Sequence, residues 1–385
     1  MITLEYKNMY DAFINHYKEK CVNPWHEISE EELNKIYDGI VTTQNIDNDY
    51  SFNYLMNFVI KKLSGKSDAH TVYDDIDCIP MNFKIFNDEV LVNFPEHLKG
   101  SKLLAINGID INVILKEIDN VITYGTEGKK VFETEKALFN KKLLFGLSLL
   151  RNVDILSMKF IDLEDNEFEK TFVKNEKYSS DQMWDRLKYL HDNPGTYEIK
   201  DNKLIISHTS VQNRYKETIE SMVEELRKLD LESIDTIVVD IRGNTGGNSA
   251  NNKSLMDFLK DSGKRIICLT DYRVFSGGRY ALLDLIKLGA TTIGTEIGTP
   301  LNCYGNCDWI EYNKHYFSSS SWYLAPNIGW SASSQEEYAS EVTEEILKPV
   351  YFKPDIEIEQ TKEDYINGID TVLSYTFEML NSKKL

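Results

Sequence analysis

The first region of the chain has the hydrophobic period of amphipathic helices. Apolar and aromatic residues recur at 10, 13, 14 and 17, and again at 52, 55, 56, 59, 60 and 63. This spacing follows the 3.6-residue period of a helix that buries one face. Ser29-Glu30-Glu31-Glu32 has the form of a capped helix start. We therefore predict an N-terminal helical subdomain over residues 1–80.

From residue 81 to 175 the pattern changes to short strands separated by turn signals. Asn107-Gly108, directly after an apolar run, is a strong hairpin signal. The predicted strands are 83–85, 89–92, 102–106, 155–160 and 168–173, and one helix is predicted at 111–122. We predict a β-rich domain over 81–175.

The third region, 176–385, alternates between strand and helix patterns. A connecting helix is predicted within 176–195. Several elements then follow: a strand at 203–207, a helix at 215–229, a strand of the fully buried type at 235–241, a helix around Leu255, a strand at 265–270 and a helix from about 280. This order indicates an α/β domain with right-handed crossovers over one sheet. Further on we predict strands at 309–317 and 321–324, a helix at 335–347 and a closing helix at 364–380.

Composition narrows the classes of partner. The net charge of −19 and the pI near 4.9 disfavour nucleic acid and anionic membranes. The five cysteines are scattered and odd in number, which is typical of a reducing compartment. There is no signal-peptide pattern and no apolar run of about 18 residues. We expect a cytoplasmic protein without a metal or another cofactor.

Ser276 is the first candidate for chemistry. It lies in Phe275-Ser276-Gly277-Gly278, between the apolar run 265–270 and a helical pattern. Free N–H groups at a helix N-terminus favour a developing oxyanion, so Ser276 is a candidate nucleophile. The alternative is an ordinary helix N-cap serine.

A second candidate is the glycine-rich turn 242–248, which follows the buried strand at 235–241. It lacks the Lys-Ser/Thr of a P-loop and does not fit Gly-x-Gly-x-x-Gly. Its adjacent glycines, Gly246 and Gly247, allow backbone N–H groups to approach an anion closely. An oxyanion hole needs that geometry, and a plain tight turn is the alternative.

Four sequence motifs together resemble the C-terminal-processing (tail-specific) and tricorn-type serine peptidases, and a further segment resembles a PDZ domain. Asp68-Ala69-His70-Thr71 is similar to the family's Asp-x-His-Thr element, and 100–108 is similar to the core of a PDZ domain. Residues 239–247 resemble the family's Asp-Leu-Arg-x-Asn-x-Gly-Gly turn. Residues 275–278, followed by 289–294, match the nucleophile turn and its next strand. The run that begins at Pro354-Asp355-Ile356 matches the family's ending.

The resemblance implies a fold and a mechanism. The fold is α/β, with a ClpP/crotonase-like peptidase core, the N-terminal helical subdomain and an inserted PDZ-like β-rich domain. Ser276 would be the nucleophile, with oxyanion donors from Gly277 and from Gly246 or Gly247. The tail-specific branch places a Lys base about 25 residues after the serine, but residues 296–302 contain none. The base is therefore expected to be His70, as in the His-using branch.

Several points stay open in the sequence. In the His-using branch a glutamate orients the histidine. Its distance along the chain from the serine points to Glu336 or Glu337, whereas its distance from Pro354 points to Glu344 or Glu345. Arg279 stands where many relatives carry an acidic residue. Lys287 is a poor substitute for the Lys base, because it lies within the predicted helix. His208 is a weaker candidate for the base than His70.

The predicted function is a serine endopeptidase that cleaves peptides or unfolded protein ends, and relatives are often homo-oligomers. The alternatives are a peptide-binding protein with an inactive site and, more weakly, an acyl-CoA enzyme.

Overall fold

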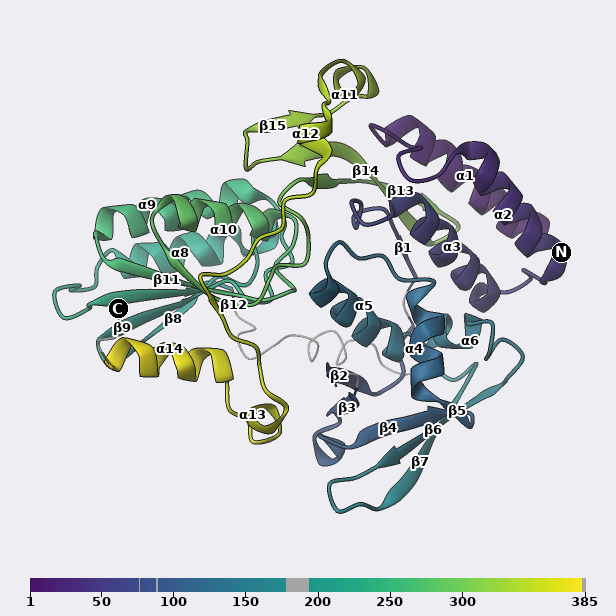
Figure 1. Ribbon diagram of the computed structural model, residues 1–385, viewed down its shortest axis with the longest axis horizontal. Coiled ribbons are helices and arrows are strands. Elements are labelled where there is room, and N and C mark those ends of the chain that lie inside the picture. The colour runs from purple at the N-terminus through teal and green to yellow at the C-terminus, as the bar shows by residue number, and fades with distance from the viewer. Residues whose placement is uncertain (76, 88, 178–193, 383–385) are drawn as a thin grey trace. The chain divides into compact units, whose positions relative to one another are not determined.

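The chain folds into two compact units. The computed structural model describes residues 1–385 except 76, 88, 178–193 and 383–385 (Figure 1). Unit 1 comprises Met1–Leu187 and Asn302–Pro349, and unit 2 comprises Lys188–Leu301 and Val350–Leu385. The connecting helix predicted within 176–195 lies mostly outside the described residues. Across the described chain, no helix is long and apolar enough to cross a membrane.

Three helices open unit 1, as the hydrophobic period predicts. They are α1 (Leu4–Lys20), α2 (Glu30–Thr43) and α3 (Asp49–Ser64), and their buried faces share one aromatic-rich core. The Ser29 side chain accepts the Glu32 backbone N–H, and the Glu32 carboxylate accepts the Ser29 N–H in return. The predicted capped start is therefore confirmed.

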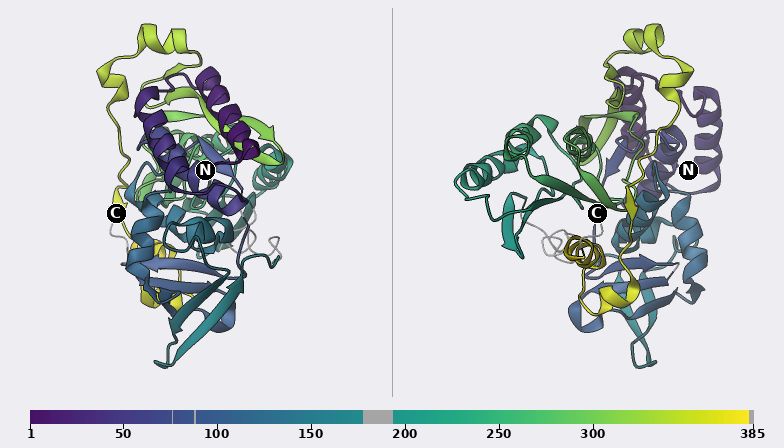
Figure 2. Two further views of the ribbon diagram at one scale, coloured as in Figure 1. Left: turned by 90° about the vertical axis from the view of Figure 1, so that its right-hand side faces the viewer. Right: turned by 60° about the vertical axis from the view of Figure 1, so that its left-hand side comes forward.

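An antiparallel sheet follows in unit 1. Its order is β2 (Asn82–Phe86), β3 (Glu89–Phe94), β4 (Lys102–Ile106), β6 (Ile155–Ile161) and β7 (Glu167–Val173), with β5 (Ile109–Asp110) paired to β4. The short 3-10 helix η1 (Glu96–Leu98) links β3 to β4. Helix α4 (Ile111–Asp119) was predicted, but α5 (Glu127–Phe139) and α6 (Lys141–Gly146) were not. All three helices contribute to the core over the buried face of this sheet (Figure 2).

Charged residues on α5 form a compact set of ion pairs. The Glu133 carboxylate lies 2.8 Å from the ammonium groups of both Lys129 and Lys136. Burial would raise the pKa of Glu133, but the two ammonium groups outweigh it and lower this pKa to about 2. Glu133 is thus ionised over the whole working pH range of most proteins.

The outer edge of β2 is occupied by the chain's own α5–α6 segment. The Ile85 N–H donates to the Glu135 carboxylate at 3.0 Å, and the Lys84 ammonium lies 3.1 Å from the same carboxylate. Both charged side chains are almost fully buried. Just before β2, the Ile79 N–H donates to the Phe139 carbonyl. An added peptide strand would have to displace these contacts.

The second part of unit 1 is a sheet of β1 (Val72–Asp74), β14 (His315–Ala325) and β13 (Cys303–Tyr312), with β15 (Trp330–Ala332) paired to β14. It carries Phe317 into the aromatic core beneath α1. The single helix predicted at 335–347 is instead two, α11 (Gln335–Glu341) and α12 (Glu344–Leu347), because Thr343 is extended and caps the second.

Unit 2 is a sheet in the order β16 (Ile356–Glu357), β12 (Thr291–Gly294), β11 (Arg265–Thr270), β10 (Thr236–Asp240), β9 (Lys203–Ser207) and β8 (Thr196–Lys200). All neighbouring pairs are parallel except β8 with β9. Helices α8 (Lys216–Leu226), α9 (Lys253–Ser262) and α10 (Gly277–Lys287) cover one face (Figure 1). The predicted strand and helix order is confirmed from residue 203 to 294.

The other face of this sheet is covered by α14 (Thr371–Asn381). The closing helix predicted at 364–380 is divided into α13 (Lys362–Ile366) and α14, because Gly368 between them has a φ of +71°. Each of β9, β10 and β11 leads into a turn and a helix at its carboxyl end. Ligand sites of parallel sheets lie at that edge.

Candidate active site

Ser276 occupies the turn between β11 and α10, as predicted. Its φ of +49° and ψ of −120° lie in a region that non-glycine residues rarely adopt, at a typical cost of about 1–3 kcal/mol. Although it is the N-cap residue by position, its side chain makes no capping hydrogen bond. The ordinary capping role therefore does not account for this serine.

Three glycines surround Ser276 at distances that leave no room for a side chain. A Cβ on Gly246 would lie 2.7 Å from the Ser276 Cβ and 2.6 Å from the Gly277 nitrogen. A Cβ on Gly277 would lie 2.4 Å from the Gly247 carbonyl oxygen and 2.9 Å from the Gly247 nitrogen. The structure thus brings together Ser276, Gly277, Gly246 and Gly247, as the oxyanion prediction requires.

The hydrogen bonds of this turn distinguish Gly246 from Gly247. The Gly246 N–H already donates to the Asn244 side-chain oxygen at 3.0 Å. Within the described residues, the N–H groups of Gly247 and Gly277 have no acceptor. An oxyanion hole needs two donors that are not used by the protein. Gly247 and Gly277 meet that condition, and Gly246 does not.

Asn244 holds the two turns together. This fully buried side chain donates to the His208 carbonyl at 2.7 Å, in addition to accepting from Gly246. Its own carbonyl accepts the Phe275 N–H at 2.9 Å. Asn244 lies within the motif at 239–247, but no role was predicted for it. The signal was an Asn two residues before the paired glycines, where its amide can reach the backbone.

Two arginine–aspartate pairs flank the glycine-rich turn. The Arg242 guanidinium bonds both Asp240, at the end of β10, and Asp370, the N-cap of α14. Burial would lower the pKa of Arg242, but the two carboxylates raise it well above its ordinary value. Asp271 accepts the Gly243 N–H and pairs with Arg273. Burial would raise the pKa of Asp271, but Arg273 and the backbone donors lower it.

The C-terminal motif has a structural role in unit 2. Asp355 accepts both the N–H and the hydroxyl of Thr292, and its own N–H donates back to that hydroxyl. Asp364 accepts the Thr371 hydroxyl at 2.6 Å. These residues fasten the last segment of the chain to β12 and α14.

Neither of the cations that follow Ser276 is available as a simple base. Arg279 is fully buried, and its guanidinium donates to the Pro300 carbonyl at 3.2 Å. Lys287 lies at the far end of α10, is exposed and pairs with Asp284. The Arg279 guanidinium therefore links α10 to the backbone at Pro300.

His70 lies in unit 1, immediately before β1, and is buried. Its N–H and that of Thr71 both donate to the Asp68 carboxylate at 3.0 Å. Its carbonyl accepts the Ser318 hydroxyl at 2.6 Å, and its ring edge lies close to Gly305. Asp68 thus fixes the backbone of the predicted base, which explains the Asp-x-His-Thr spacing.

The four candidate acids all lie at the starts of two short helices in unit 1. Glu337 accepts the N–H and hydroxyl of Ser333, and these bonds lower its pKa. Glu336 is in the first turn of α11, and Glu344 and Glu345 are in the first turn of α12. The identity of the acid stays a prediction.

His208 follows β9 in unit 2 and is fully buried. Its Nε2 lies 2.8 Å from the Asn252 side-chain oxygen, and its backbone N–H donates to Asp240. Burial lowers the pKa of His208, so the ring is neutral at pH 7. His208 is thus an interior residue, although it directly follows the end of a strand.

Comparison by sequence identified no relative. No protein-family model matches the chain, and no curated protein matches it.

Comparison by structure gave clear matches. The fold is similar to that of mature CPAF, with a TM-score of 0.62 and 10% identity over 99% of this chain and 98% of that one. Mature CPAF complexed with lactacystin matches with the same TM-score and 9% identity, over 99% and 97% of the two chains. At these identities the likeness shows a shared mixed α/β fold with several sheets.

Structures named as proteases are also among the matches. The photosystem II D1 C-terminal processing protease matches over 99% of this chain and 97% of that one, with 12% identity and a TM-score of 0.44. That score carries no argument about this chain. Beside the motif resemblance to the tail-specific peptidases, the structural matches thus establish a likeness of fold.

Proposed function

We propose that the protein is a serine endopeptidase that cleaves peptides or unfolded protein ends through an acyl-enzyme. The observation that carries the proposal is the turn at Ser276. There, a serine without a capping hydrogen bond packs closely with Gly246, Gly247 and Gly277, and the N–H groups of Gly247 and Gly277 have no acceptor among the described residues. The N-terminus of α10 adds the positive end of its dipole.

The proposed chemistry uses Ser276 and His70. The Ser276 oxygen attacks the peptide carbonyl carbon while His70 takes the hydroxyl proton. The oxyanion accepts hydrogen bonds from the N–H groups of Gly247 and Gly277. The C–N bond then breaks, and the amine leaves with the proton from His70. Water next takes the place of the amine: His70 removes a proton from it as its oxygen attacks the ester carbon, and the ester C–O bond breaks as His70 returns the proton to the Ser276 oxygen. This mechanism requires the His70 ring to come within hydrogen-bond reach of Ser276.

Other parts of the resemblance are also proposals. We propose that unit 2 is a ClpP/crotonase-like core and that the sheet from β2 to β7, with its helices, is a PDZ-like insert. A cytoplasmic location and a homo-oligomeric state remain predictions. The occupied edge of β2 gives no support to the alternative of a peptide-binding protein that acts by strand addition at that edge.

The test is covalent labelling by a serine-reactive phosphonate, combined with hydrolysis of fluorogenic peptides. Ser276→Ala is expected to lose all labelling, and Ser276→Ala and His70→Ala are each expected to lower kcat by about 10⁴-fold or more. Thermal melting checks that each variant is folded. His208→Gln is the matched control, because it replaces a buried histidine near the turn.

Two outcomes would overturn the proposal. Labelling of a different serine, or wild-type hydrolysis by Ser276→Ala, would show that Ser276 is not the nucleophile. Full activity in His70→Ala together with loss of activity in His208→Gln would show that the base is His208, in unit 2, and not His70.

A further inference from the structure

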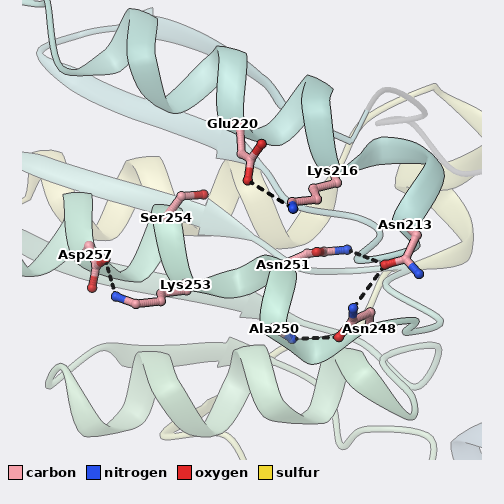
Figure 3. A pocket seen from close by; sticks show the side chains of 9 residues that line it. All are labelled: Asn213, Lys216, Glu220, Asn248, Ala250, Asn251, Lys253, Ser254 and Asp257. Carbon is pink, nitrogen blue, oxygen red and sulfur yellow. Dashed lines mark hydrogen bonds and ion pairs between the residues drawn. The ribbon is translucent and has the colours of Figure 1, made fainter.

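A polar pocket of about 560 Å³ lies between the N-terminal ends of α8 and α9 in unit 2 (Figure 3). Its volume falls in the range of about 300–1,000 Å³ that is common for small-ligand sites. We propose that this α8–α9 pocket binds a carboxamide side chain, Gln or Asn, of the peptide substrate close to the scissile bond. The inference rests on the proposed peptidase function and names a substrate preference for it.

The pocket begins one residue after the candidate oxyanion donor. Asn248, which lines it, directly follows Gly247. The Asn248 N–H donates to the Val211 carbonyl, and the Val211 N–H donates to the Gly246 carbonyl at 3.2 Å. A short parallel bridge therefore joins the wall of the pocket to the turn at Ser276. A peptide whose carbonyl lies in the oxyanion hole would carry a neighbouring side chain toward this wall.

Two residues that line the pocket, Asn251 and Ser254, each carry a side-chain oxygen without a partner among the described residues. The Asn251 amide nitrogen donates to the Val211 carbonyl and to the Asn213 side-chain oxygen. Its own side-chain oxygen receives no hydrogen bond from the described residues. The Ser254 hydroxyl oxygen is buried and likewise has no partner in the described chain. Buried hydroxyls without partners typically cost about 1–3 kcal/mol.

A carboxamide complements these two groups. Its N–H₂ donates to the free oxygen of Asn251, and its C=O accepts the Ser254 hydroxyl. A carboxylate lacks the donor and an ammonium lacks the acceptor. A hydrocarbon side chain would leave both protein groups unpaired. Asn251 and Ser254 are therefore expected to favour Gln and Asn over these other side chains.

The charges around the pocket cancel in pairs. Lys216 lies 3.9 Å from Glu220 across one wall, and Lys253 lies 2.6 Å from Asp257 across the other (Figure 3). All four side chains are at least half exposed. Because each cation has its own anion, the rim does not select a charged side chain by net field. A neutral polar group fits this electrostatic setting.

The test is a set of fluorogenic peptides in which Gln, Asn, Ala, Leu, Glu and Lys are placed in turn at each position flanking the cleaved bond. At one position, kcat/KM is expected to be about tenfold or more higher for Gln or Asn than for Ala, Leu, Glu or Lys. Ser254→Ala is expected to reduce the Gln/Ala ratio at that position about tenfold. Ser262→Ala, on the same helix but with its hydroxyl bonded to Leu259, should leave the ratio unchanged.

Two results would overturn the inference: a preference for Leu, Glu or Lys at every position, or a Gln/Ala ratio that Ser254→Ala does not change. If the wild type cleaves no peptide, the proposed function fails, and the pocket is then tested by calorimetry on Ser276→Ala. Tighter binding of a Gln peptide than its Ala counterpart, lost in Ser254→Ala/Ser276→Ala, would support the pocket. Equal binding would reject it.

Discussion

Gly246→Ala should separate the shape of the oxyanion turn from the stability of the fold. The added Cβ would lie 2.6 Å from the Gly277 nitrogen, 2.7 Å from the Ser276 Cβ and 2.8 Å from the Phe275 carbonyl oxygen. Ordinary contact begins at 3.4 Å, so these atoms must move apart by 0.8, 0.7 and 0.6 Å respectively. None belongs to a flexible side-chain end, so the turn itself must shift.

The magnitude follows from this displacement. Catalytic groups must be held within about 0.5 Å, and loss of one oxyanion donor costs about 10²–10³ in kcat. We expect kcat of Gly246→Ala to fall by about 10²-fold or more, with a small change in KM. The variant should also be less stable than the wild type. The φ of +103° at residue 246 strains an alanine by about 1–3 kcal/mol, and overpacking by the added Cβ costs about 1–3 kcal/mol more.

Gly289→Ala provides the matched control. Its φ is +83°, but a Cβ there would have no atom within 4 Å. This variant should lose about 1–3 kcal/mol of stability, as judged by urea unfolding, and keep the wild-type kcat. The reasoning is refuted if Gly246→Ala turns over peptides like the wild type. It is also refuted if Gly289→Ala loses as much kcat as Gly246→Ala.

Three further predictions concern charge and burial. Because the pKa of Glu133 is about 2, its ion pairs stabilise the fold above pH 4.5 and are lost as pH falls through 2. Urea unfolding of Glu133→Gln should show a loss of about 3 kcal/mol at pH 7 that vanishes near pH 2. The lowered pKa of His208 means that acidification below about 6.5 destabilises the wild type, because the unfolded chain takes up the proton. His208→Gln should therefore show a smaller fall in melting temperature between pH 7 and 5. Glu135→Ala should speed hydrogen exchange at the Ile85 amide and cost about 3–5 kcal/mol, and unchanged exchange would show that the edge of β2 is not held by that carboxylate.

The parallel sheet could be predicted well because its strands are uninterrupted apolar runs. Residues 203–207 and 265–270 appear in the structure with the predicted bounds. Helices α5 and α6 were missed because α5 carries several charged residues on its buried side, including Glu135 and Lys129. Those charges are tolerated only because they pair with each other and with the edge of β2, and such pairing has no local sequence signal.

The candidate site could be predicted as a set of residues but not as a hydrogen-bond network. The motifs identified Ser276 and the paired glycines, yet only the structure shows that Asn244 occupies the Gly246 N–H. The burial of Arg279 was also beyond the sequence, because its partner is a backbone carbonyl 21 residues away. Backbone partners at such distances leave no pattern in the order of the residues.

The bond between Arg242 and Asp370 determines when, during synthesis, the glycine-rich turn gains its support from the last helix. These residues are 128 positions apart, and Arg242 directly precedes the glycine-rich turn. A ribosome makes Asp370 long after the glycines, so a nascent chain carries the serine and the turn for several seconds without this support, at about 5–20 residues per second. The last helix then completes the side of the sheet opposite Ser276. A chain that stops before this helix would contain every residue of the candidate site and still lack the anchor of the glycine-rich turn.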